Sequence, residues 1–136
     1  MPPAATSTPS GGGPRALDHP SHDAIRLEDV LHALADPVRL GIVLVLDEAE
    51  GECSCSVFDA PVSKSTLTHH FRVLREHGVI TQAYRGTAKM NALRRDDLED
   101  LFPGLLDTVL TAARRQAAAG RGAGAGAAAT AATGGA

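Results

Sequence analysis

The feature that most constrains this chain is the stretch SKSTLTHHFRVLREHG, residues 63–78. Its apolar residues form one narrow helical stripe: Leu67, Phe71 and Leu74. Ser63 is a good N-cap and Gly78 a good C-terminal stop, so the sequence predicts a helix between them. The other faces carry cations, histidines and hydroxyls, with Glu76 as the single acid. Such a helix has one face for a core and the others suited to a polyanion.

The charge of the chain is distributed unevenly. The 136 residues carry a net charge of -3, which by itself does not suggest a nucleic-acid partner. Residues 61–95 hold seven Lys or Arg and one acid, a net charge of +6. The rest of the chain holds six Lys or Arg and fifteen acids, a net charge of -9. This asymmetry is typical of a surface that meets nucleic acid. With three Phe, one Tyr and no Trp, no stacking platform for RNA is expected, so the predicted partner is double-stranded DNA.

The segments before this helix predict three more helices. Apolar residues at i, i+3, i+4 and i+7 indicate one helix from Leu27 to about residue 35. Asp36 followed by Pro37 is a cap and a first-turn proline, so a second helix begins there and reaches about residue 47. A short helix is expected over residues 53–58. A turn then joins it to the basic helix, which predicts a helix-turn-helix.

The segments after Gly78 change period. Residues 79–84 and 87–93 read as two strands around Arg85-Gly86, a hairpin that would form a wing. A helix then begins at Asp96 or Asp97, is interrupted by Pro103 and resumes with an apolar face. The predicted fold class is mainly α with a small β-hairpin, a winged helix-turn-helix.

The two ends of the chain differ from its middle in composition. Residues 1–20 are rich in Pro, Ser, Thr, Ala and Gly, and residues 116–136 are almost all Ala and Gly with some Thr. Both are expected to be disordered tails, which leaves a folded domain over residues 21–115. Neither a signal peptide nor a membrane span is expected, and two cysteines do not make a disulfide framework. The predicted location is the cytoplasm.

The predicted DNA contacts lie on the basic helix and on the hairpin. The N-terminal half of the second helix of a helix-turn-helix enters the major groove, where short polar side chains reach base edges. Arg72 suits either a guanine or a phosphate, and Lys64 suits a phosphate. The hairpin adds two cations for the backbone or the minor groove. The full set is Ser63, Lys64, Ser65, Thr66, Thr68, His69, Arg72, Arg75, Arg85 and Lys89.

From about Val30 to Leu110 the chain resembles the ArsR/SmtB family of bacterial winged-helix repressors. The stretches that carry the likeness are LHALADPVRLGIVLVL, ECSCS, SKSTLTHHFRVLREHGVI and YRGTAKMNALRRDDLEDLFPGLL. The resemblance implies a homodimer, built by its first and last helices, that represses a promoter through a palindromic operator and answers to an effector. The implied dimer contacts, which would otherwise be intrachain core, are Leu27, Val30, Leu31, Leu105, Leu106, Val109 and Leu110.

The first candidate effector site is the pair Cys53 and Cys55. It lies where many members of that family carry a Cys-x-Cys site, and thiolates suit soft metals and metalloids. The chain departs from the family pattern, because it has no third cysteine and has Ser56 where an acid is common. Another group would have to complete the site. The alternatives are a thiol that is oxidised or persulfidated, or two small half-buried residues without a ligand.

The second candidate effector site is a group of histidines near the N-terminus. His19 and His22 lie beside Asp18 and Asp23, and His32 follows on the first helix. Imidazole and carboxylate suit nickel or zinc. The alternative is a polar linker that happens to hold histidines.

Two functions of different classes follow. The first is a DNA-binding transcriptional repressor that responds to a metal ion, such as nickel or zinc, or to a thiol-reactive effector. The second is a winged-helix protein-interaction module, or co-repressor subunit, that regulates transcription through a partner protein. The chain has no nucleophile–base arrangement and no phosphate loop, so neither an enzyme nor an organic cofactor is expected.

Overall fold

The computed structural model describes residues 15–54 and 62–130, with side chains up to residue 120. The chain divides into one unit that ends at Asp97 and a second that begins at Leu98. The helices are α1 (Leu27–Leu34), α2 (Pro37–Ala49), α3 (Lys64–Glu76), α4 (Arg95–Leu101) and α5 (Leu105–Thr130), and His22–Ala24 form a 3-10 turn. The strands are β1 (Arg15–Ala16), β2 (Cys53–Ser54), β3 (Ile80–Arg85) and β4 (Ala88–Leu93).

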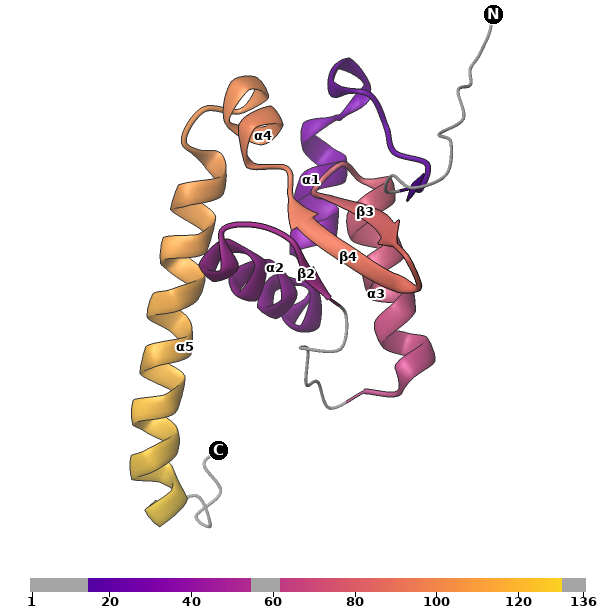
Figure 1. The fold of residues 1–136 in the computed structure, drawn as a ribbon. Coiled ribbons are helices and arrows are strands. Elements are labelled where there is room, and N and C mark those ends of the chain that lie inside the picture. The colour runs from indigo at the N-terminus through magenta and orange to yellow at the C-terminus, as the bar shows by residue number, and fades with distance from the viewer. Residues whose placement is uncertain (1–14, 55–61, 131–136) are drawn as a thin grey trace, which may run out of the picture. The chain divides into compact units, whose positions relative to one another are not determined.

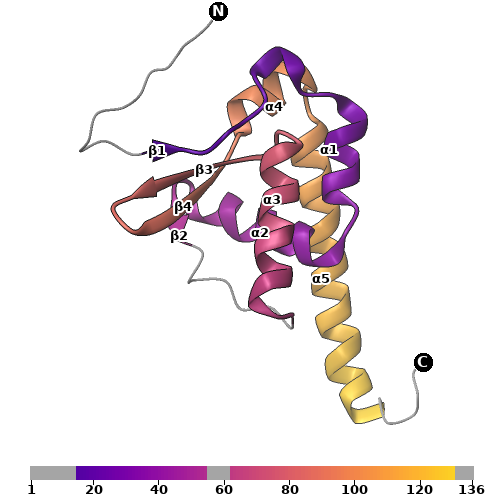
Figure 2. The ribbon, with the colours of Figure 1, turned by 90° about the vertical axis from the view of Figure 1, so that its right-hand side faces the viewer.

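The strands form one antiparallel sheet in the order β1-β3-β4-β2. Its centre is the hairpin of β3 and β4, in which Tyr84 pairs with Lys89 and Gln82 with Asn91. The turn uses Gly86 at a φ of 63°, a left-handed conformation that glycine adopts without steric cost. The predicted hairpin is therefore confirmed, and it projects away from helices α1, α2 and α3 (Figures 1 and 2).

The predicted caps set the helices of the first unit. The Asp36 side chain accepts hydrogen bonds from the backbone N–H of Val38 and Arg39 at 2.9 and 3.0 Å, so α2 begins at Pro37 as expected. Ser63 caps α3 by accepting from the N–H of Thr66 at 3.2 Å. The buried faces of helices α1, α2 and α3, with the start of β3 and the residue before it, supply most of the core of this unit: Val30, Ala33, Leu34, Ile42, Val43, Leu46, Phe71, Leu74, Val79 and Ile80.

The predicted short helix over residues 53–58 is wrong at its start. Cys53 and Ser54 form strand β2, in which Cys53 pairs with Asn91 and Ser54 with Met90. The open edge of β4 offers backbone partners to this segment, and such a pairing between distant residues leaves no local signal in the sequence. Residues 55–58 lie outside the described part of the chain.

The boundaries of the two predicted tails also differ from the structure. Residues 15–20 are ordered, because β1 pairs with the free edge of β3 and the N–H of Leu17 donates to the carbonyl of Gln82 at 3.0 Å. At the other end, α5 continues to Thr130, since the helix propensity of its many alanines outweighs the cost of its glycines. The rest of both predicted tails, residues 1–14 and 131–136, falls outside the described residues. Within the described ranges, no helix combines the length and hydropathy of a membrane span.

Two glycines make a matched test of this fold. Gly78 ends α3 at a φ of 84°, and a Cβ there would lie 2.6 Å from the Ile25 side chain. Gly41 lies inside α2, and a Cβ there meets nothing within 4 Å. We expect Gly78→Ala to lower the free energy of unfolding by about 1–2 kcal/mol or more, and Gly41→Ala to raise it by about 0.5–1 kcal/mol. Urea denaturation at one fixed protein concentration measures both, and equal effects would contradict this account.

Candidate nucleic-acid interface

Helix α3 is amphipathic and buries the predicted apolar stripe. Phe71 and Leu74 are 2% and 0% exposed, while Leu67 is half-buried at the edge of the same stripe. The opposite faces are open to solvent and carry the predicted contacts Lys64, Ser65, Thr68, His69 and Arg72. The narrow apolar stripe thus leaves the polar faces of this helix free to meet a ligand.

A groove of about 300 Å³ lies between α3 and the β-hairpin. Six of the ten predicted contacts line it together with Gln82: Ser65, Thr68, His69, Arg72, Arg75 and Lys89. An adjoining cavity of about 380 Å³ also takes in Lys64 and the hairpin residues Thr87 and Ala88. Neither lining contains a carboxylate. The two elements therefore enclose one basic, hydroxyl-bearing surface, which we call the α3–wing groove.

Two of the predicted contacts serve the helix itself. Ser63 Oγ donates to Thr66 Oγ1 at 2.9 Å and accepts from the Thr66 N–H. These hydroxyls satisfy part of the helix N-terminus, where backbone N–H groups otherwise lack partners. They hold the start of α3 in place beside the groove.

Arg75, a predicted DNA contact, has a largely buried side chain. Its side chain is 13% exposed, and its Nη1 donates to Gln82 Oε1 at 2.8 Å. Gln82 Nε2 in turn donates to Asn91 Oδ1 at 2.7 Å, and Asn91 Nδ2 donates to the carbonyl of Cys53 at 3.2 Å. This polar relay of Arg75, Gln82, Asn91 and Cys53 connects α3 through the sheet to β2.

Sequence reasoning missed Gln82 and Asn91, which are 1% and 0% exposed. The available signal is their position on the strands. Gln82 lies on the same face of β3 as Ile80 and Tyr84, because side chains two residues apart point to one side of a strand. An amide therefore occupies the face that packs against the core. A buried amide in such a place requires hydrogen-bond partners, and here the two amides meet each other.

The hairpin presents its two predicted cations differently. Arg85 Nε and Nη2 donate to the two carboxylate oxygens of Glu52 at 2.5 and 3.1 Å, and this hydrogen bonding lowers the pKa of Glu52. Part of the Arg85 charge is therefore neutralised by a neighbouring carboxylate at the surface. Lys89 instead lies with its Nζ 5.8 Å from the centre of the Tyr84 ring and lines the α3–wing groove.

A second buried cluster fixes α3 against the first two helices. Arg39 is 8% exposed, and its Nε donates to the carbonyl of Ala33 at 2.7 Å. Its Nη1 donates to His70 Nδ1 at 3.2 Å, and the same His70 nitrogen lies 4.0 Å from Asp36. His70 therefore packs on the core side of α3, whereas its neighbour His69 faces the groove.

The three predicted histidine ligands each have another partner in the structure. His19 Nε2 accepts from the backbone N–H of Gln82 at 2.8 Å, His22 Nδ1 lies 2.7 Å from the Asp23 carboxylate, and the His32 ring stacks on His77. Across the part of the chain that the structure describes, no three His, Cys, Asp or Glu side chains form a group that could hold a metal ion. Cys53 is half-buried and free of a disulfide, and Cys55 lies outside the described residues.

The predicted dimer contacts divide by exposure. Leu27 and Leu31 are 42% and 45% exposed on α1, whereas Val30, at 1%, belongs to the core instead of the surface. On α5, Leu106 and Leu110 are buried, and Leu105 and Val109 are half-buried.

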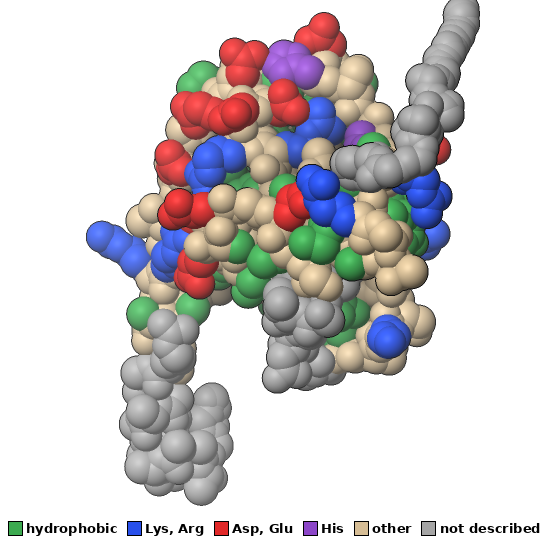
Figure 3. Space-filling model, viewed as in Figure 1, with side chains coloured by type: hydrophobic (Ala, Val, Ile, Leu, Met, Phe, Trp, Pro, Cys, Tyr) green, Lys and Arg blue, Asp and Glu red, His purple; other side chains and the backbone are tan. Residues whose placement is uncertain are grey.

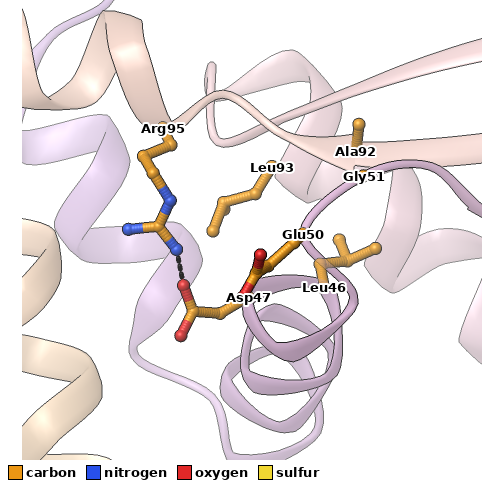
Figure 4. Close-up of a pocket in the computed structure, with 7 residues that line it drawn as sticks. All are labelled: Leu46, Asp47, Glu50, Gly51, Ala92, Leu93 and Arg95. Carbon is orange, nitrogen blue, oxygen red and sulfur yellow. Dashed lines mark ion pairs between the residues drawn. The ribbon is translucent and has the colours of Figure 1, made fainter.

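A separate cavity of about 470 Å³ lies between the end of α2 and the end of β4 (Figure 4). Leu46, Leu93 and Ala92 supply apolar walls, and Arg95 pairs with Asp47 at its edge. Its lining includes no cysteine and no histidine, so it offers neither a thiolate nor an imidazole ligand.

The fold and the α3–wing groove fit a DNA-binding protein of the winged helix-turn-helix class. A family model described as a helix-turn-helix domain matches residues 34–83. The HTH-type transcriptional regulator YceK of Bacillus subtilis, itself described as uncharacterised, is 33% identical over 91 residues, which cover 65% of this chain and 90% of that protein. An HTH-type transcriptional regulator of Methanocaldococcus jannaschii, described in the same way, is 30% identical over 75 residues, which cover 54% and 84%. The chain therefore belongs to the family of helix-turn-helix transcriptional regulators.

The stability of the first unit should depend on pH through His19. Burial, with Arg94 and Arg75 nearby, lowers the pKa of His19, so the folded state keeps it neutral where an unfolded chain takes up a proton. Stability should therefore fall as the pH drops below about 6.5, the ordinary pKa of histidine. We expect the urea midpoint to drop less between pH 7.5 and 5.5 in His19→Gln than in the unaltered protein. His69→Gln, at an exposed position, is the control; an equal drop in all three proteins would exclude His19 as the cause.

Proposed function

We propose that this regulator is a repressor of the ArsR/SmtB type, which binds a palindromic operator as a homodimer. The observation that carries the proposal is the α3–wing groove, where Arg72, Lys89 and the hydroxyls of Ser65 and Thr68 surround one cavity without a carboxylate. A groove with this lining attracts phosphate and offers donors to base edges. The resemblance of residues 30–110 to that family supports the finer assignment.

In this proposal α3 enters the major groove by its N-terminal half. Ser65, Thr68 and His69 face outward on the first turns, where side chains of a recognition helix reach base edges. Arg72 lies one turn further along and pairs with a guanine or a phosphate. Lys64 at the start of the helix and Lys89 on the hairpin contact the phosphates on either side.

The dimer is proposed from the exposed apolar residues of α1. Leu27 and Leu31 are one helical turn apart and leave more than two fifths of their surfaces in water. A partner copy would remove this apolar area from water, which is favourable in proportion to the area buried. The two α3 helices of a dimer would then meet half-sites one turn of DNA apart, about 34–36 Å.

Arg72→Ala tests the proposal. We expect full-length protein to bind a labelled promoter fragment from upstream of its own gene with an affinity that falls steeply with salt. Arg72→Ala should weaken binding about tenfold to a hundredfold, since a good base or charged contact is worth about 1–3 kcal/mol. Arg26→Ala is the matched control, because Arg26 is exposed and pairs with Glu28 on α1. Fluorescence anisotropy measures affinity, and sedimentation gives the number of chains per duplex.

The alternative function is a winged-helix module that regulates transcription through a partner protein. It predicts no salt-dependent binding of any duplex by the unaltered protein. Equal affinity of Arg72→Ala and Arg26→Ala for DNA would in addition remove α3 as the recognition element. The basic lining of the α3–wing groove favours the first function, because a protein-binding surface does not require this single sign of charge.

We propose that the effector acts at Cys53, through a soft metal ion or a thiol-reactive compound. The support is the polar relay, in which the carbonyl of Cys53 is joined through Asn91 and Gln82 to Arg75 on α3. A ligand or modification that moves β2 would change the last hydrogen bond of this relay and so bias the position of α3. The histidines are less suited, because His19 already uses its Nε2 to hold the backbone.

The effector proposal is tested on the protein–DNA complex. Zinc, nickel, arsenite and a mild thiol oxidant are titrated in turn, and we expect one of them to change DNA affinity. Cys53→Ser should abolish that response. Gln82→Leu/Asn91→Leu breaks the relay at its centre, at a cost in stability because Arg75 Nη1 and the Cys53 carbonyl also lose these partners. It should leave the thiol reactive by mass spectrometry yet remove the response. A response that persists in Cys53→Ser would place the effector elsewhere.

A further inference from the structure

The N-terminal segment of the described chain is built into the wing. In β1, Arg15 pairs with Tyr84 and Ala16 with Ala83 on β3. His19 accepts the N–H of Gln82 at 2.8 Å, and Arg94 Nη1 donates to the carbonyl of Pro20 at 2.8 Å. The hairpin is therefore widened by a third strand whose position is fixed by side-chain hydrogen bonds as well as by the ladder.

The register places Arg15 on the side of the sheet that faces α3. Arg15 is opposite Tyr84, and Tyr84 is opposite Lys89, so the three side chains are cross-strand neighbours on one face. Two residues further along β3, on that same face, Gln82 accepts a hydrogen bond from Arg75 of α3. The face that carries Arg15 is thus the face that borders the α3–wing groove.

The three neighbours form a stack of charge and aromatic ring. Arg15 Cζ lies 5.3 Å and Lys89 Nζ 5.8 Å from the centre of the Tyr84 ring, within the range of cation–π attraction. The ring therefore holds two cations close together near the end of the hairpin. Basic side chains gather at the margin of the molecule where β1 borders β3, on the right of Figure 3.

We infer that Arg15 is a DNA-contacting residue, which with Lys89 holds a backbone phosphate beside the site read by α3. The inference rests on the proposed DNA binding. It assigns to β1 the role that sequence reasoning gave to Arg85, whose guanidinium is paired with Glu52. Arg15 is exposed and adds a positive charge near the turn of the wing, at the level of the hairpin where Lys89 lines the groove. A planar guanidinium in this position suits two oxygens of one phosphate.

The test measures the salt dependence of DNA binding by the full-length chain. The probes are the promoter fragment and a duplex of shuffled sequence of the same length, both followed by fluorescence anisotropy. Arg15→Ala should make the slope of log affinity against log salt shallower by about 0.9 for each phosphate contact that the bound protein loses. It should weaken both duplexes by the same factor, because a phosphate contact carries no sequence information. Arg15→Lys should restore most of the slope, and Arg26→Ala should leave it unchanged.

The outcomes separate this inference from the proposed function. If Arg15→Ala and Arg26→Ala give the same slope while Arg72→Ala weakens binding, the wing contact is refuted and DNA binding stands. If Arg15→Ala weakens only the promoter fragment, the residue reads bases and the phosphate assignment is overturned. If the unaltered protein binds neither duplex, the proposed function itself fails. Circular dichroism of Arg15→Ala should match the unaltered protein, since the side chain is exposed.

Discussion

The arrangement of the first unit depends on the buried amide of Gln82. Its Oε1 accepts from Arg75, its Nε2 donates to Asn91, its N–H donates to His19 and its carbonyl accepts from Leu17. The residue is 1% exposed, so each of these groups would cost free energy if it lost its partner. Because the four partners come from α3, β4 and the N-terminal segment, Gln82 can be satisfied only when all three are in place. A single residue thereby sets the position of α3 relative to the β-hairpin.

This constraint explains which cations are available at the α3–wing groove. Arg75 is drawn inward by Gln82, and Arg85 is held by Glu52, so neither presents a free guanidinium. Arg72 and Lys89 remain at the groove, and β1 adds Arg15 at the same end of the hairpin. Counting basic residues in the segment 61–95 therefore overestimates how many free charges this surface offers. Charge patterning locates a polyanion-binding face, but pairing inside the protein decides which side chains take part.

Elements that depend on local interactions can be predicted from the sequence, whereas elements that depend on pairing between distant residues cannot. The caps Asp36 and Ser63, the stripe of Phe71 and Leu74 and the glycine turn of the hairpin are local signals, and the structure confirms the elements they predict. Strands β1 and β2 are two residues long and form because β3 and β4 have open edges, so their own sequences do not predict a strand. The pairing of Gln82 with Asn91 is likewise visible only once the register is known. Helix α5 continues beyond residue 115, where a disordered tail is expected, because the alanines between its glycines favour the helix.

The two ends of the polar relay differ in how firmly they are held. Asn91 and Gln82 are satisfied by each other, and Asn91 reaches the backbone of Cys53 at 3.2 Å. At the other end, the Nε of Arg75 is buried without a hydrogen-bond partner among the described residues. A buried donor in this state costs about 1–3 kcal/mol, so an acceptor that reached this Nε would stabilise the guanidinium. This guanidinium also lines the α3–wing groove. A phosphate in the groove would meet this relay at Arg75, and a group bound at Cys53 would meet it at the hydrogen bond from Asn91, so the proposed effector response requires that the two ends be coupled through Gln82.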